Sequence, residues 1–214
     1  RNYEFCDKLN CNIKKLSLKE IKKLLNQRYK LDKNDVIFLG FKKNFKNYLT
    51  FSNDPYWNEI KLFDTLIKFQ KDIKVNVDEE KKMINIYTDK GGKVFFTGGE
   101  LNNWTINYSN HNKLEKIISL KNKNKYKLIN GCLNFYDLNI SNSNININNS
   151  LCEDAINFVR VKGNLKGINV SDSASAGVDL DFSKIKVDKL VVSNSLNDCI
   201  DFSYGDYVID VASL

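Results

Sequence analysis

Apolar and polar residues alternate through the second half of the chain. The clearest alternating pairs are Ile145/Ile147, Ile168/Val170, Ile185/Val187 and Leu190/Val192. Apolar residues spaced by two and rich in β-branched side chains are typical of strands. Clusters of Asn, Asp, Ser and Gly separate the pairs and favour turns. This region therefore predicts short strands joined by tight turns, because no ten-residue helical pattern fits between them.

The pattern recurs about every 22 residues. Ile168, Val170, Ser171 and Ser173 return as Leu190, Val192, Ser193 and Ser195, and an upstream copy (Ile145, Ile147, Asn149, Ser150) fits at a step of 23. A fixed period of this size indicates a stacked repeat. One coil cannot bury its apolar face alone, so we expect coils stacked about 4.8 Å apart. The sequence predicts a mainly β fold, a right-handed parallel β-helix solenoid with coils of ~22 residues.

The coils resemble the right-handed parallel β-helix, or pectin-lyase-like, superfamily. The resemblance covers about residues 75–214 and rests on coil length and on ladders such as Asn149, Asp172 and Asn194. It implies an enzyme acting on acidic or surface polysaccharides, or a tailspike or adhesin. Residues 197–200 (Asn-Asp-Cys-Ile) are similar to an Asp-Asp-Cys segment of polygalacturonases. The further glycine-histidine-glycine motif of those enzymes is absent from the sequence, so their mechanism is not transferred.

The N-terminal part of the sequence predicts a different structure. Residues 17–29 have the apolar spacing of an amphipathic helix, residues 35–40 read as a buried strand, and residues 56–70 predict a second helix. Strand patterns begin near Val75. We therefore expect an N-terminal α/β cap region over residues 1–74 and a parallel β-helix over residues 75–214.

The net charge of the chain and its C-terminal sequence indicate which partners to expect. The net charge is +7, and Lys and Arg concentrate in residues 1–130, which suits an anionic partner or a solvated surface. No nucleic-acid motif accompanies this charge, so a nucleic acid is not an expected partner. No apolar run reaches 18 residues, so no membrane span is expected. Val208–Val211 begins another coil, and we expect another domain, a partner chain or a short segment to cover it.

Five cysteines are present. We interpret Cys132, Cys152 and Cys199 as small buried residues, whereas Cys6 and Cys11 are spaced to close a small loop. No Cys-x-x-Cys pair and no histidine cluster supports a zinc site, and no cofactor is expected.

Aligning the coils brings acidic residues together. Alternation directs Ile156, Val178 and Ile200 inward, and directs Asn157, Asp179 and Asp201 outward in one stack with Asp181 on the same face. Carboxylates about 5 Å apart raise one another's pKa, which suits general acid–base catalysis. The alternatives are a turn-forming ladder and a Ca²⁺ site built from the same oxygens. The candidate catalytic positions are Asp154, Ala176, Asp179, Asp181, Asp198 and Asp201.

Ala176 stands where the coils before and after carry Asp154 and Asp198. Alanine is the usual replacement that silences an acid, so we hypothesise that the parent sequence has aspartate at this position. Arg160 is the nearest cation and Tyr204 a nearby aromatic ring, which makes both candidates for substrate binding.

These observations favour a carbohydrate-active enzyme acting on an acidic or cell-surface polysaccharide through a ladder of aspartates. Such a substrate goes with a secreted or cell-surface location. The alternative is a non-catalytic β-helix that serves as a glycan-binding or adhesin-like module of a larger protein.

Overall fold

A computed structural model describes residues 57–111 and 131–214, together with the backbone of two short strands at 36–38 and 48–50. The described chain consists of strands and turns. In chain order the strands are β1 (Val36–Phe38), β2 (Tyr48–Thr50), β3 (Trp57–Leu62), β4 (Thr65–Gln70), β5 (Lys74–Asp78), β6 (Met83–Thr88), β7 (Val94–Thr97), β8 (Glu100–Asn102), β9 (Thr105–Asn110), β10 (Gly131–Tyr136), β11 (Asn139–Ser150), β12 (Asp154–Val159), β13 (Lys162–Ser173), β14 (Ala176–Asp181), β15 (Lys184–Ser195), β16 (Ile200–Ser203) and β17 (Asp206–Ser213).

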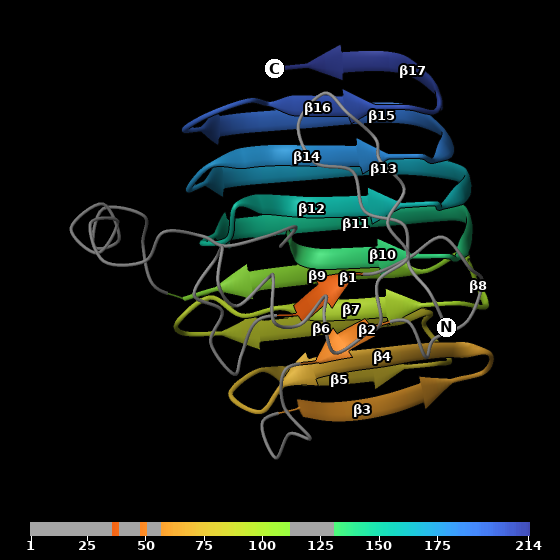
Figure 1. Cartoon of the computed structure of the whole chain (residues 1–214), viewed down its shortest axis with the longest axis vertical. Coiled ribbons are helices and arrows are strands. Elements are labelled where there is room, and N and C mark those ends of the chain that lie inside the picture. The colour runs from red at the N-terminus through yellow and green to blue at the C-terminus, as the bar shows by residue number, and fades with distance from the viewer. Residues whose placement is uncertain (1–35, 39–47, 51–56, 112–130) are drawn as a thin grey trace, which may run out of the picture.

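The strands stack as a β-solenoid (Figure 1). One sheet has seven strands in the order β16-β14-β12-β10-β7-β4-β3, and the other has eight strands, with β17-β15-β13-β11-β9-β6-β5 as its main path and β8 beside β11. Successive strands of one sheet come from successive coils, so the chain passes from one sheet to the other and back in each coil. This confirms the predicted mainly β fold of stacked coils.

The register between coils matches the period in the sequence. Asn134 lies beside Asn157, and Ile145 beside Ile168, both at a step of 23. Val178 lies beside Ile200 at a step of 22. In a parallel sheet these neighbours share hydrogen bonds at a spacing of about 4.8 Å, so the repeat length fixes which side chains meet.

The core lies between the two sheets. Phe96, Phe135 and Phe158 are fully buried and stack in a row, with ring centroids 4.8 and 5.0 Å apart. Opposite them, buried Ile and Val side chains of the eight-stranded sheet form parallel rows, as the alternating pattern requires. Each apolar residue therefore packs on its equivalent in the next coil, and burial accumulates along the solenoid.

The Asn149, Asp172 and Asn194 ladder lies at the ends of β11, β13 and β15, where each residue is the last but one of its strand. Their φ angles are 59°, 59° and 55°, in the left-handed region that Asn and Asp tolerate better than most residues. The Asn149 amide donates to the carbonyl of Asn110 at 3.2 Å, and the Asn194 amide donates to Asp172 Oδ1 at 3.0 Å. The ladder serves the turn and bonds neighbouring coils.

The predicted helix over residues 56–70 is wrong. This segment forms the antiparallel hairpin of β3 and β4, and β4 pairs antiparallel with β7 at the end of the seven-stranded sheet. Thr65, Ile67 and Phe69 point inward at a spacing of two, whereas Phe63 sits in the turn and is 60% exposed. Pairing with the edge of the solenoid decided the outcome over the helical spacing of the apolar residues. The predicted helix over residues 17–29 lies outside the described residues.

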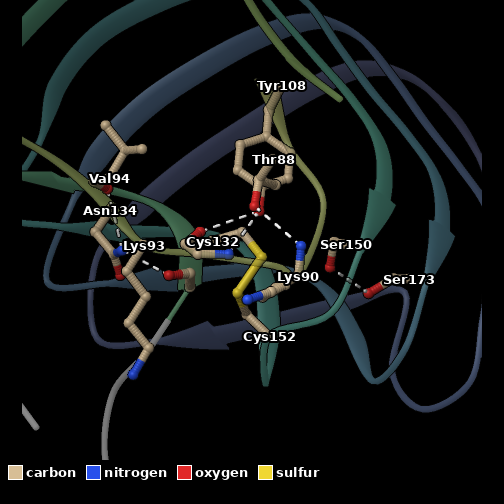
Figure 2. The surroundings of a disulfide bond; sticks show 12 residues. Thr88, Lys90, Lys93, Val94, Tyr108, Cys132, Asn134, Ser150, Cys152 and Ser173 are labelled. Atoms are coloured by element: carbon tan, nitrogen blue, oxygen red, sulfur yellow. Dashed lines mark hydrogen bonds between the residues drawn. A yellow bond between two sulfur atoms is a disulfide. The ribbon is translucent and has the colours of Figure 1, made fainter. Parts of the chain in front are cut away.

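Two cysteines are bonded rather than free. Cys132 and Cys152 form a disulfide, with Cα atoms 5.3 Å apart (Figure 2). It joins the start of β10 to the turn before β12, beside the buried Tyr108 hydroxyl that bonds Gly92. Cys199 is a free, half-buried thiol. Cys6 and Cys11 lie outside the described residues.

Within the described part of the chain, no helix is long and apolar enough to cross a membrane.

Removing the disulfide should destabilise the solenoid. We expect the Cys132→Ala/Cys152→Ala double variant to lose about 2–4 kcal/mol of unfolding free energy, because the bond closes a 20-residue separation and its removal frees the unfolded chain. Urea denaturation followed by circular dichroism measures the change. Cys199→Ala, which removes a thiol without a bond, is the matched control; equal midpoints for the two variants would contradict this expectation.

Candidate functional site

The predicted acidic positions lie on the outward face of the seven-stranded sheet. Asn134 (β10), Asn157 (β12), Asp179 (β14) and Asp201 (β16) occupy one register row, which we call the acidic row. Their neighbours Ile156, Val178 and Leu180 belong to the core, so the row points the other way. The 22-residue alignment therefore placed Asn157, Asp179 and Asp201 together correctly.

Exposure changes along the acidic row. Asn134 and Asn157 are fully buried, Asp179 is half-buried, and Asp201 is exposed. Asn157 Nδ2 donates to Asp179 Oδ2 at 2.6 Å. The Asn157 side chain also hydrogen-bonds Asp154, which lies three residues earlier in β12 and is 8% exposed. One amide therefore bridges two carboxyl groups of neighbouring coils.

Burial and like charge act together on these carboxyl groups. Burial, followed by the charges of Asp181, Asp154 and Asp201, raises the pKa of Asp179 to about 8. Burial, followed by the charge of Glu153, raises the pKa of Asp154 to about 7, although the Asn157 bond opposes this. The pKa of Asp181 is also raised, chiefly by burial. The pKa values of Asp154 and Asp179 therefore lie near neutral pH, where a carboxyl group can both hold and release a proton.

The structure also fixes the positions of Ala176 and Asp198. Ala176 lies directly beside Asp154 in the register of β12 and β14, and is buried. An aspartate at position 176 would place another carboxyl group beside Asp154. Asp198 precedes β16 and is exposed; its backbone carbonyl accepts from Gly177, and its Oδ2 accepts from the Asn197 amide at 3.2 Å. Asp198 thus belongs to a turn, whereas Asp154, Asp179, Asp181 and Asp201 influence one another electrostatically.

Arg160 is bound within the fold. Its Nε and one terminal nitrogen donate to the two carboxylate oxygens of Asp137 at 2.7 and 2.8 Å. Two charge-assisted bonds of this kind are stronger than neutral hydrogen bonds and fix the orientation of the guanidinium. The sequence suggested Arg160 as a substrate ligand, but in the structure its guanidinium is paired with Asp137. The sequence analysis did not single out Asp137.

Tyr204 and Phe182 form an exposed aromatic surface at the end of the same strands. The two rings are parallel within 7°, with centroids 5.7 Å apart, and are 83% and 53% exposed. We call them the rim pair. They continue the row of Asp137 and Arg160, and all four residues have positive φ, an uncommon conformation for bulky residues. Phe182 was missed in the sequence, although its step of 22 from Tyr204 was a usable signal.

Two further tyrosines serve the fold. Tyr136 is buried and stacks on Phe95 with centroids 5.8 Å apart. The Tyr207 hydroxyl lies within hydrogen-bonding distance of the carbonyls of Leu180 and Ser203, at 2.9 and 2.8 Å, so it links two adjacent coils. Over residues 57–111 and 131–214, no group of three or more His, Cys, Asp or Glu is arranged to hold a metal ion.

The acidic row should make stability depend on pH. The folded-state pKa of Asp179 lies above its ordinary value, so the folded protein binds the extra proton, and stability falls as pH rises from about 4 to about 8. Asp179→Asn removes this titration and should raise the unfolding free energy at pH 8 by about 1–2 kcal/mol, a figure reduced for solvent access. Thermal melts at pH 5 and pH 8 measure the difference.

Asp172→Asn is the matched control, because it removes a carboxyl group near the end of β13, at a ladder position where the adjacent coils already carry Asn149 and Asn194. If the unfolding free energy at pH 8 rose equally in the two variants, or did not rise in Asp179→Asn, the ionised Asp179 would not destabilise the fold and the prediction would be wrong.

Comparison with family models, with curated proteins and with solved structures found no match. The fold assignment therefore depends on the register of the coils, which shows a β-solenoid of about five turns. The residues of the site are assigned from their geometry alone.

Proposed function

We propose that this chain is a carbohydrate-active enzyme of the pectin-lyase-like kind that cleaves a cell-surface polysaccharide. The observation that carries the proposal is the presence, on two consecutive coils, of outward carboxyl groups followed by exposed stacked rings: Asp179 and Asp181 before Phe182, and Asp201 before Tyr204. Parallel exposed rings bind the apolar faces of sugars, and paired carboxyl groups perform acid–base chemistry.

The placement of Asp179 and Asp201 on adjacent strands favours glycoside hydrolysis. Asp179 and Asp201 are register neighbours on adjacent parallel strands, which lie about 4.8 Å apart. Two carboxyl groups about 5 Å apart are typical of glycosidases in which one residue protonates the leaving oxygen and the other attacks the sugar carbon. Asp179, with its raised pKa, is the proposed acid, and the more exposed Asp201 is the proposed nucleophile. Water then cleaves the glycosyl ester, with Asp179 acting as the base.

The disulfide agrees with a substrate outside the cytoplasm. Disulfides persist in oxidising compartments and are rare in the cytosol. The Cys132–Cys152 bond is buried in the core beside β10 and β12, so it belongs to the folded state. It supports a secreted or cell-surface location.

Product release from a panel of neutral, acidic and amino-bearing polysaccharides, followed by mass spectrometry, tests the proposal. We expect Asp179→Asn to lower kcat at least 100-fold, because the general acid is lost, and Asp172→Asn to leave it unchanged. Activity should fall as pH rises through about 8, where Asp179 loses its proton. An Asp179→Asn enzyme with near-native turnover would contradict the assignment.

The same panel should be applied to Ala176→Asp, because Ala176 occupies the register position beside Asp154. If position 176 is a silenced acid, turnover appears, or rises at least tenfold, only in this variant. Equal turnover by the unaltered protein and the Ala176→Asp variant would refute the hypothesis of a silenced acid. If neither protein turned over any substrate, the result would contradict the enzyme proposal and favour the alternative function, a non-catalytic glycan-binding or adhesin-like module.

A further inference from the structure

Part of the outward face of the seven-stranded sheet is buried. Phe95 (β7), Tyr136 (β10) and Val159 (β12) alternate with core residues and form an apolar cluster of their own, with exposed fractions of 5%, 1% and 3%. Asn134 and Asn157, beside them on β10 and β12, are fully buried. We call these five residues the covered face. A side chain on the outside of a sheet loses its exposure only when something lies over it, so the covered face has a second layer.

The buried part of this face ends between β12 and β14. At the same register positions Asn157 is followed by Asp179, and Val159 by Asp181, and both aspartates are half-buried. Asp201, one strand further, is exposed. The change from apolar and amide side chains to carboxyl groups coincides with the change from buried to open surface. The second layer therefore ends at the edge of the acidic groups.

One described element is left to form this layer. Every described strand belongs to one of the two solenoid sheets except β1 and β2, which pair with each other as a separate two-stranded sheet. The eight-stranded sheet lies across the core, on the opposite side. Apart from Thr50, the residues of β1 and β2 are Val36, Ile37, Phe38, Tyr48 and Leu49. A two-stranded hairpin is marginally stable alone and needs a surface to pack on.

The chain enters the solenoid at the covered face. Trp57, the first residue of β3, packs against the apolar cluster, with its ring centroid 5.5 Å from that of Phe95. Residues 51–56 join β2 to β3, and the chain from Thr50 to Trp57 spans at most about 25 Å. In the order of the sheet, β12 is four strands from β3, which corresponds to about 19 Å. A hairpin held at Trp57 therefore reaches β7, β10 and β12.

The sequence between β1 and β2 has a charge opposite to that of the acidic groups. It contains Lys42, Lys43 and Lys46 and no acidic residue. Asp179 and Asp181 lie at the edge of the covered face and belong to a set of carboxyl groups that repel one another. Attraction between the lysines and these carboxyl groups favours association of the hairpin with this face.

We propose that the β1–β2 hairpin (residues 36–50) packs on the covered face, as a layer on the side of the solenoid. Its apolar residues bury Phe95, Tyr136 and Val159, and the lysines between its strands lie at the edge next to Asp179 and Asp181. The strands β14 and β16 stay open beyond this edge. The inference concerns packing within the chain and does not depend on the proposed enzyme activity.

Photocrosslinking in the full chain tests this contact. With p-benzoylphenylalanine in place of Tyr136, irradiation should join position 136 to residues 36–50, as read by mass spectrometry of the digested protein. With the same probe in place of Tyr204, which is 83% exposed, we expect at least tenfold less of this product. If position 136 is joined only to another part of the chain, such as residues 112–130, only to a second copy, or to nothing, the inference is overturned.

A reaction of the unaltered protein decides the outcome if the variant at Tyr136 does not fold. A carbodiimide joins lysines directly to carboxyl groups that touch them. We expect Lys42, Lys43 or Lys46 to be joined to Asp179 or Asp181 within one chain. Absence of this product, or its formation only between chains, overturns the inference. Both reactions report contact rather than turnover, so an inactive protein can still confirm the hairpin's position and an active one can refute it.

Discussion

The stacking of each coil on the next at the hydrogen-bonding distance of a parallel sheet is the constraint on which the rest of this structure depends. It holds residues 22 or 23 apart in the sequence beside one another from β10 and β11 onward, and residues 39 apart where β7 pairs with β10 and β9 with β11. The same stacking of coils that aligns Phe96, Phe135 and Phe158 inside the solenoid aligns Asn157, Asp179 and Asp201 outside it. Core and candidate site are therefore two faces of one register.

Stacking stabilises the inner, apolar face of the solenoid and destabilises the outer, acidic face. Identical apolar residues gain from stacking, because each covers its neighbour from water. Identical carboxyl groups lose, because each repels its neighbour, and burial makes the loss larger. The Asn157 amide offsets part of it by bridging Asp154 and Asp179. The repulsion that remains is the property on which the proposed acid–base role rests.

The two rows of positive-φ turn residues show the same contrast. One row carries Asn149, Asp172 and Asn194, residues that tolerate this conformation, and it is explained by the turn. The other passes from an ion pair, Arg160 with Asp137, to the exposed rings of Phe182 and Tyr204. Bulky side chains in a left-handed turn have a conformational cost, and the proposed contact of these rings with a sugar would offset it. That row borders the acidic row, which is why both enter one functional proposal.

By itself, the sequence determined the coil length, the inward apolar rows and the alignment of Asn157, Asp179 and Asp201, because a period of 22 or 23 residues and a strand period of two leave one register that buries Ile156 and Val178. It did not determine the hairpin of β3 and β4, since its apolar spacing also fits a helix, and only pairing with β7 selects the strand. The sequence also did not determine the Cys132–Cys152 bond, because spacing alone does not show which cysteines face each other.

Only the tertiary structure decided that Arg160 is held by Asp137, that Tyr136 is buried while Tyr204 is exposed, and that Phe182 completes the rim pair. These depend on side-chain directions at turns and on what covers each face, neither of which a linear pattern specifies.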